Sequence, residues 1–325
     1  MIIESAFKPA WWLPNSHAQT IYSPLMRRLK SPVDRCERFE LPDGDFVDLA
    51  WAENGLGPDT PLVIILHGLG GSVHSTYVPG LLHASNQRGW RGVLMHFRGA
   101  SDEPNRLPRA YHSGDTGDVD CLLHALEKRE PNTKKAIVGV SLGGNVLLKW
   151  LGEKGHQSLV QTAVAVSVPF QLRLAADRMN RGFARVYQAY LLRQLRQVLA
   201  RNLKNHETNL PPAFTQLESF RCFWTFDDQV TAPMNGFVNV HDYYRQASSR
   251  QFLPKIVTPT LIIHALDDPF MTPSVVPAAD ELSKDVTLEV SQKGGHVGFI
   301  TGNLPGMPVY WLDQRIPEFL QTYLD

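Results

Sequence analysis

Ser141 lies at the centre of a Gly-x-Ser-x-Gly sequence that spans residues 139–143. An apolar run, 136–140, comes before the serine, and mainly apolar residues follow it over 146–151. This pattern is typical of a nucleophile elbow, in which a sharp strand-to-helix turn presents the serine hydroxyl to a substrate. Glycines are needed there because the helix returns close to the strand. The alternative interpretation is a glycine-rich turn whose serine only caps the helix.

A serine hydroxyl becomes a good nucleophile only when a base lies within hydrogen-bond reach and an acid orients that base. His296 is the predicted base, because it follows the last predicted strand in a glycine-rich loop, 293–299, that can bend towards Ser141. His264 lies inside an apolar run and is expected to be a core residue with its hydrogen bonds satisfied. Three further histidines, in loops or in a predicted helix, are weaker candidates: His17, His112 and His241.

Two adjacent aspartates, Asp267 and Asp268, follow the apolar run 261–264, and either could be the orienting acid. In comparable enzymes the acid stands just before the short turn that carries the chain away, which favours Asp268. Asp267 would then point elsewhere or cap the turn. A second pair, Asp227 and Asp228, is interpreted as capping a turn or a helix.

Acyl transfer also needs N–H groups that stabilise the negative charge on the tetrahedral intermediate. The backbone N–H of Leu142, directly after the serine, is one predicted donor, and that of Leu69 in the glycine-rich loop 67–72 is the other. This loop lacks the glycine spacings of dinucleotide-binding and ATP-binding loops, so a nucleotide site is not expected. No metal or other cofactor is predicted.

Apolar runs that alternate with helical patterns define the elements that must position these residues. The predicted strands are 61–66, 90–97, 136–140, 162–168, 258–264 and 286–290, and the predicted helices include 77–88, 115–130 and 310–324. This order predicts an α/β fold with a mostly parallel central sheet and helices on both faces. An Asp-Gly turn between 38–41 and 46–51 predicts a β-hairpin.

The alternation of strands and helices stops at residue 169 and returns near residue 255. We therefore expect residues 169–254 to form a helical lid over the carboxyl ends of the strands, where open α/β sheets bind ligands. Residues 1–168 and 255–325 would form the core, with an N-terminal arm, 1–35, packed on it. As a set, the aromatic side chains of the lid are expected to line an apolar cleft, although packing explains each one singly: Phe170, Phe183, Tyr187, Tyr190, Phe223, Trp224 and Phe237.

Composition excludes several classes of protein. The 325 residues are 43% hydrophobic and include 32 basic and 32 acidic side chains, so no charge surplus favours nucleic acid as a partner. No apolar run approaches the roughly 18 residues that span a membrane, and the N-terminus has no signal-peptide pattern. Three widely spaced cysteines, Cys36, Cys121 and Cys222, are expected to be reduced, mostly buried thiols, which fits a cytoplasmic protein.

Beyond the elbow at 139–145, several short segments carry a resemblance to a known family: 15–20, 41–46, 67–72, 96–99, 111–114, 226–228 and 294–299. Together they resemble the α/β-hydrolase superfamily along nearly the whole chain, and more narrowly its YheT-like branch with the related ABHD1/ABHD3-type proteins. Ala100 departs from the cysteine that such proteins often carry there. The resemblance implies an α/β-hydrolase fold and hydrolysis of carboxylic esters, with acyl transfer or action on phospholipids in some relatives.

We therefore expect a serine esterase with a Ser141–Asp268–His296 triad and an acyl-enzyme intermediate. The expected substrate is a small-molecule ester with an apolar acyl group, and no pattern in the sequence indicates an oligomeric state. Two alternatives keep the triad, namely an acyltransferase and a hydrolase of phospholipids or acylglycerols. In a third alternative the triad is inactive and the protein is a ligand-binding module.

Overall fold

A computed structural model describes residues 1–203 and 216–325, whereas residues 204–215, which fall within the predicted lid, lie outside the description. The strands of the described residues are β1 (Ile2–Glu4), β2 (Arg35–Glu40), β3 (Phe46–Ala52), β4 (Leu62–Leu66), β5 (Arg91–Met95), β6 (Lys135–Val140), β7 (Thr162–Val166), β8 (Thr260–Ala265), β9 (Val286–Ser291), β10 (Ile300–Thr301) and β11 (Val309–Tyr310).

The main sheet has the spatial order β1-β9-β8-β7-β6-β4-β5-β3-β2. Neighbouring strands from β1 to β5 run parallel, and β3 and β2 are antiparallel at one edge. The mostly parallel sheet and the hairpin predicted from the sequence are both confirmed. A small second sheet pairs β10 with β11.

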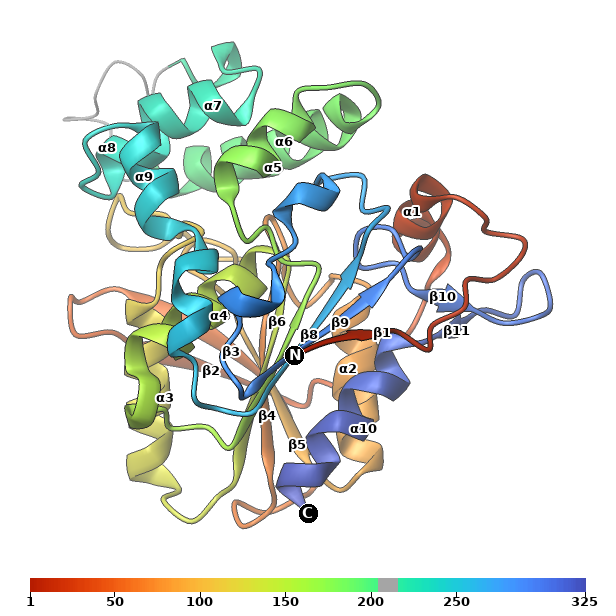
Figure 1. The fold of residues 1–325 in the computed structure, drawn as a ribbon. Coiled ribbons are helices and arrows are strands. Elements are labelled where there is room, and N and C mark those ends of the chain that lie inside the picture. The colour runs from red at the N-terminus through yellow and green to blue at the C-terminus, as the bar shows by residue number, and fades with distance from the viewer. Residues whose placement is uncertain (204–215) are drawn as a thin grey trace.

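The helices lie on both faces of this sheet and at one end of it (Figure 1). The α-helices of the described residues are α1 (Ser16–Met26), α2 (Tyr77–Gln87), α3 (Gly117–Arg129), α4 (Leu142–Lys154), α5 (Leu172–Met179), α6 (Ala184–Leu203), α7 (Phe223–Phe226), α8 (Ala232–Met234), α9 (Val240–Ala247) and α10 (Leu312–Leu324). Shorter helical turns are η1 (Gly155–Gln157), η4 (Leu217–Ser219), the π-helix η5 (Asp227–Thr231), η6 (Ser249–Lys255), η7 (Pro273–Val275) and η8 (Ala279–Glu281).

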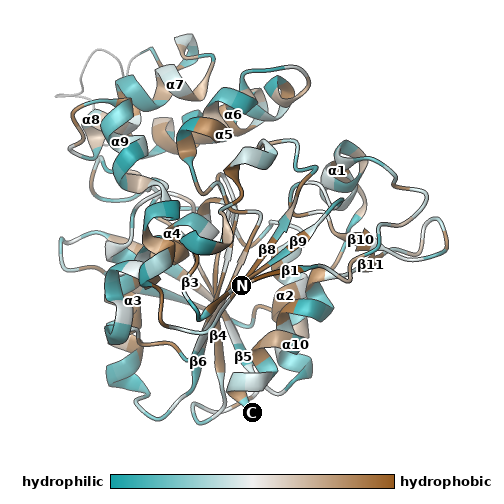
Figure 2. Ribbon diagram, viewed as in Figure 1, coloured by the Kyte–Doolittle hydropathy of each residue, from teal (hydrophilic) through white to brown (hydrophobic). Residues whose placement is uncertain are grey.

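Two apolar clusters, one on each face of the sheet, follow the alternation of side chains along β4. Leu62, Ile64 and Leu66 pack with side chains of α3 and α4, and Val63 and Ile65 pack with side chains of α2 and α10. Burial on both faces explains why this strand reads as a continuous apolar run. Figure 2 shows hydrophobic colouring along the central strands and hydrophilic colouring on parts of the surrounding helices.

The described residues between β7 and β8 contain helices and no strand. Helices α5 to α9 form a group above the end of the sheet at which β6 leads into α4 (Figure 1). A third apolar cluster belongs to this group, since its buried members all lie between Leu172 and Ala247.

The N-terminal segment contains two elements that no periodicity predicted. β1 pairs in parallel with β9 at the edge of the sheet. The helix α1 begins after Asn15, whose side chain accepts a hydrogen bond from the N–H of Ala18 over 2.8 Å. A strand of three residues is too short to show an alternation of apolar and polar side chains, which is why the sequence pattern missed it.

The expectation of mostly buried thiols is wrong: Cys36 is exposed, and Cys121 and Cys222 are half-buried, although all three are free. Among the described helices, none is both long and apolar enough to cross a membrane.

Candidate active site

Ser141 occupies the turn between β6 and α4 with φ 53° and ψ −115°, a conformation that non-glycine residues rarely adopt. Two glycines make this turn possible. A Cβ on Gly139 would lie 2.5 Å from the carbonyl oxygen of Gly143, and a Cβ on Gly143 would collide with the carbonyl oxygen of Leu66. The strained backbone is therefore held by close contact between the helix and the strands, as an exposed nucleophile requires.

His296 connects Ser141 to Asp268. The Nε2 atom of His296 lies 3.0 Å from Ser141 Oγ, and its Nδ1 lies 2.7 Å from Asp268 Oδ2. Asp268 is only 3% exposed, and its other oxygen accepts a hydrogen bond from the N–H of Phe270 over 2.8 Å. The structure thus brings Ser141 together with two residues that follow it by more than a hundred positions in the sequence, and it places His296 between the serine and Asp268.

Asp267 has a different contact from its neighbour. Its Oδ1 accepts a hydrogen bond from the N–H of Gly295 over 2.9 Å, next to the histidine rather than on the imidazole. Burial raises the pKa of Asp267 above its ordinary value, although the hydrogen bond from Gly295 opposes this effect. Asp267 therefore fastens the loop that carries His296.

The N-terminal helix α1 supports the same loop, which the sequence analysis did not anticipate. The Thr20 hydroxyl donates to the carbonyl oxygen of Ser16 over 2.7 Å and accepts a hydrogen bond from the backbone N–H of His296 over 2.9 Å. The buried Gln19 side chain accepts from the N–H of Ile300 and donates to its carbonyl oxygen, over 2.7 and 3.0 Å. The segment 15–20 was visible in the sequence as part of a resemblance, but its role depends on contacts across the fold.

Two tyrosine hydroxyls hold the loop that follows β4. Tyr77 accepts a hydrogen bond from the N–H of Gly68 over 2.9 Å, and Tyr111 accepts one from the N–H of Gly70 over 2.8 Å. Within the described residues, the N–H of Leu69 between them and the N–H of Leu142 have no hydrogen-bond acceptor. Both predicted oxyanion donors therefore have their hydrogens available beside Ser141, and both residues line the same pocket as the serine.

His67 fixes the start of this loop. Its Nε2 accepts a hydrogen bond from the N–H of Phe97 over 3.1 Å, so its Nδ1–H donates to the carbonyl oxygen of Gly68 over 2.7 Å. Burial lowers the pKa of His67 to about 3, which keeps the ring neutral and compatible with this arrangement.

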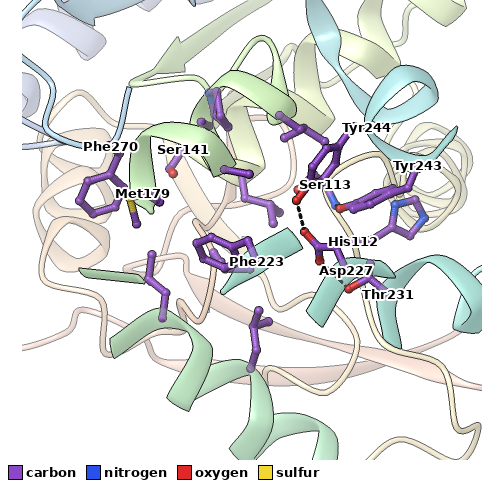
Figure 3. Close-up of a pocket in the computed structure, with 18 of the residues that line it drawn as sticks. His112, Ser113, Ser141, Met179, Phe223, Asp227, Thr231, Tyr243, Tyr244 and Phe270 are labelled. Carbon is purple, nitrogen blue, oxygen red and sulfur yellow. Dashed lines mark hydrogen bonds between the residues drawn. The ribbon is translucent and has the colours of Figure 1, made fainter. Parts of the chain in front are cut away.

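A pocket leads from Ser141 into the helices between β7 and β8 (Figure 3). The space between its side chains, including the open mouth, is about 760 Å³. Aliphatic side chains make up much of its wall: Leu69, Leu142, Leu172, Ala175, Ala176, Met179, Leu191, Leu195 and Met271. Aromatic and polar groups complete the lining, among them Phe270 beside His296, and Asp227 with Tyr244.

The expectation that seven aromatic residues of 169–254 line the cleft is wrong for six of them. Of these seven residues, Phe223 alone lines this pocket. Phe170 is buried in the apolar cluster that contains side chains of α3 and α4. Phe183 and Tyr190 are exposed. Tyr187 packs beside Phe270. Of the other two, Trp224 donates a hydrogen bond to Asp177 within the helical group, and Phe237 lies against His112 of the loop before α3. Aliphatic residues replace them because the inner sides of α5 and α6 carry leucine and alanine.

In the described part of the chain, none of the remaining candidate histidines forms a hydrogen bond with Ser141 Oγ. His17 contacts the hydroxyl of Tyr187, and His241 is exposed beside Trp224. His112 lines the pocket with its Nδ1 accepting from the N–H of Gly114. His264 is buried in β8, but the expectation that its hydrogen bonds are satisfied is wrong, because its Nδ1 has no partner among the described residues. Burial lowers the pKa of His264 to about 4, which keeps this ring neutral.

The second aspartate pair is only partly explained by capping. Asp228 accepts a hydrogen bond from the N–H of Val240, at the start of α9, which fits the expectation. Asp227 instead lines the pocket and accepts hydrogen bonds from Thr231 and Tyr244. Among the residues with described positions, no cluster of three or more potential ligands could hold a metal ion.

The fold and the geometry around Ser141 are those of an α/β hydrolase, and comparison with known proteins agrees. Residues 61–303 match the family model described as the alpha/beta hydrolase fold. The chain is 46% identical over 320 residues to YheT of Escherichia coli, covering 98% of this chain and 94% of YheT. The chain therefore belongs to the α/β-hydrolase family, within its YheT-like branch.

Two further known proteins are similar to this chain. The chain is 27% identical over 334 residues to phospholipase ABHD3 of Mus musculus, covering all of this chain and 80% of that protein. The esterase Pf2001 of Pyrococcus furiosus has a similar fold, with a TM-score of 0.57, 15% identity, and coverage of 92% of this chain and 99% of that structure. The protein is a hydrolase of the esterase and lipase type.

Proposed function

We propose that the protein hydrolyses carboxylic esters through an acyl-enzyme intermediate on Ser141. The observation that carries this proposal is the pair of hydrogen bonds through His296, 3.0 Å to Ser141 Oγ and 2.7 Å to Asp268 Oδ2. A base within hydrogen-bond reach of the nucleophile, itself held by a carboxylate, is the arrangement that serine catalysis requires.

In the first half of the reaction, His296 Nε2 takes the proton from Ser141 Oγ as the oxygen attacks the ester carbonyl carbon. The carbonyl oxygen becomes an oxyanion that accepts hydrogen bonds from the N–H groups of Leu69 and Leu142. Donors that already point at this position contribute roughly 3–4 kcal/mol each. The intermediate then expels the alcohol, which receives the proton from His296 Nε2, and the acyl group remains on Ser141.

In the second half, a water molecule takes the place of the alcohol. His296 removes a proton from this water as its oxygen attacks the acyl-enzyme, and the same proton returns to Ser141 when the carboxylic acid leaves. Asp268 keeps the Nδ1–H of His296 in place throughout and stabilises the imidazolium that forms in each half.

We further propose that the helical segment 169–254 acts as a lid and that the aliphatic part of the pocket holds an apolar acyl chain. The predominance of leucine, alanine and methionine in the wall supports this assignment, because such a surface binds hydrocarbon and excludes water. The same lining favours phospholipids or acylglycerols as alternative substrates of the same triad. Acyl transfer to an alcohol would differ only in the acceptor that replaces water.

The test compares Ser141→Ala with Ser274→Ala, an exposed serine outside the pocket, on esters of graded acyl length. Wild type and Ser274→Ala should hydrolyse esters and react with a fluorophosphonate probe at one serine, whereas Ser141→Ala should do neither while it keeps its melting temperature. Product analysis with phospholipid, acylglycerol and added alcohol distinguishes the alternative substrates and acceptors. A wild-type protein that binds esters but neither turns them over nor reacts with the probe would support a ligand-binding module.

A further inference from the structure

The wall of the pocket contains a polar patch formed by Asp227, Thr231, Tyr243 and Tyr244, with Ser113 beside it. Thr231 belongs to the same π-helix as Asp227, and the two tyrosines come from α9. Figure 3 shows this group on the opposite side of the drawn pocket from Ser141 and Phe270. The pocket therefore has a reactive end, an aliphatic wall and a polar region.

Asp227 has fewer partners than its two oxygens can accept. Its Oδ1 accepts a hydrogen bond from the hydroxyl of Thr231, and its Oδ2 accepts one from the hydroxyl of Tyr244, each over 2.7 Å. A carboxylate offers about four acceptor positions, so both oxygens keep acceptor capacity. In the described part of the chain, no basic side chain pairs with Asp227.

Burying an ionised carboxylate beside apolar side chains costs free energy when no cation is paired with it. Desolvation raises the pKa of Asp227 to about 6, even though both hydroxyl contacts favour the ionised form. If the residue only joined the π-helix to α9, a neutral amide could pair with both side chains at a smaller desolvation cost, its oxygen accepting from one hydroxyl and its NH2 donating to the oxygen of the other. The charge at this position is therefore better explained by a donor that enters from the pocket.

We propose that this polar patch is a substrate subsite that binds a hydrogen-bond-donating group, a hydroxyl or an ammonium, on the part of the ester that occupies the pocket. This inference rests on the proposed function, since the ester carbonyl must lie at Ser141 while the polar group lies at Asp227. The aliphatic wall between them fits the intervening carbon chain. The subsite would make the enzyme selective for esters of hydroxylated or amino-substituted chains over plain alkyl esters.

The test uses p-nitrophenyl esters of straight-chain acids in a graded series of lengths. At each length the chain ends in a methyl, a methoxy, a hydroxyl or an ammonium group. Methoxy can accept but not donate a hydrogen bond, so it separates donation from mere polarity. At the length that spans the pocket, we expect the hydroxyl and ammonium esters to exceed the methoxy ester in kcat/KM by about tenfold or more, as sites built to bind a polar group discriminate against analogues that lack it.

Three variants distinguish a subsite from a structural clamp. Asp227→Asn should lower kcat/KM for the ammonium ester by about tenfold more than it lowers kcat/KM for the methyl ester. Tyr244→Phe keeps the carboxylate and should keep the preference for ammonium. The matched control is Asp228→Asn, which changes a neighbouring carboxyl outside the pocket and should keep all four rates in their wild-type ratio. A purely structural Asp227 predicts instead that Asp227→Asn lowers all four rates together with the melting temperature.

The pH dependence gives a second measurement. The ratio of kcat/KM for the ammonium ester to that for the methyl ester removes any pH effect that both esters share, and it should fall as the pH is lowered through about 6 and Asp227 is protonated. Among the residues with described positions, the titratable groups near Asp227 include His112, Tyr243 and Tyr244 in the pocket, together with Cys222 and Asp228. Burial lowers the pKa of His112 to about 3 and raises that of both tyrosines above 10, so these rings do not titrate in this range. The ratio should be flat in Asp227→Asn and should still slope in Asp228→Asn.

Binding measurements separate this inference from the proposed function. Ser141→Ala should bind the intact ammonium ester more tightly than the methoxy ester by calorimetry, and Ser141→Ala/Asp227→Asn should not. If wild type hydrolyses all four series with equal kcat/KM at every length, the subsite is wrong while the esterase proposal stands. If no ester is hydrolysed and Ser141 does not react with a fluorophosphonate, the proposed function fails, and equal binding of the two esters would then overturn the subsite as well.

Discussion

The imidazole of His296 lies face to face with the ring of Phe270, with centroids 3.9 Å apart and planes inclined by 12°. The backbone N–H of Phe270 also donates to Asp268 Oδ1, so one residue contacts both the proposed base and the proposed acid. Since the imidazole is held at Nδ1 by Asp268 and on one face by Phe270, rotation away from Ser141 would break contacts of both kinds.

Phe270→Ala should therefore lower kcat because the imidazole loses the ring that fixes its plane. A stacked aromatic pair contributes about 0.5–1.5 kcal/mol, which corresponds to a decrease of up to about tenfold. Steady-state kinetics on short and long esters should show a similar decrease for all of them, with slower fluorophosphonate labelling of Ser141. Phe270→Tyr keeps the ring and is the control; a wild-type labelling rate in Phe270→Ala would contradict the positioning role.

Asp268→Asn should reduce kcat by about three to four orders of magnitude, because the amide favours the wrong tautomer of His296. The amide of Asp267→Asn can still accept the hydrogen bond from the N–H of Gly295. This variant should therefore lower kcat by less than roughly tenfold, which is the size expected for one altered hydrogen bond. The two variants are matched controls for each other, measured on one ester with melting temperatures recorded. The reverse ranking would identify Asp267 as the catalytic acid.

Thr20→Val should impair catalysis from outside the pocket. The valine removes the acceptor of the His296 backbone N–H, and an unpaired backbone group costs about 1–3 kcal/mol. We expect kcat to fall by about tenfold while KM changes little, because Thr20 does not line the pocket. Thr20→Ser retains the oxygen and should restore activity. A decrease of equal size in Thr20→Ser would mean that the methyl group, rather than the hydrogen bond, is what matters.

Ala176→Leu should shift the preferred acyl length towards shorter chains. Ala176 is 4% exposed and lines the aliphatic wall, so a larger side chain takes space from the end of the acyl group. Each methylene in an apolar pocket is worth about 1–3 kcal/mol, so the change should be visible over two carbons. The acyl-length profile is compared with that of Tyr190→Ala, an exposed residue outside the pocket. A profile that changes in height but not in shape would exclude this wall from substrate selection.

The sequence by itself determined the parallel sheet, the turn at Ser141, and the choice of Ser141, His296 and Asp268 as candidates. These features are local. An apolar strand buried on both faces shows its burial in a continuous run such as 62–66, and a turn with φ 53° at Ser141 needs its glycines within two positions. The chain order of serine, acid and histidine then leaves few choices, because the acid and the base must follow later strands.

Only the tertiary structure decided which side chains hold those residues and what fills the pocket. Thr20 contacts His296 across 276 positions of sequence, and Tyr111 contacts Gly70 across 41. The wall of the pocket was mispredicted for a related reason. An aromatic residue on an amphipathic helix can face its own cluster, the solvent or the cavity, and composition does not distinguish these directions. Asp227 reads as a helix cap in the sequence, whereas in the structure it lines the pocket and accepts a hydrogen bond from Tyr244 of α9.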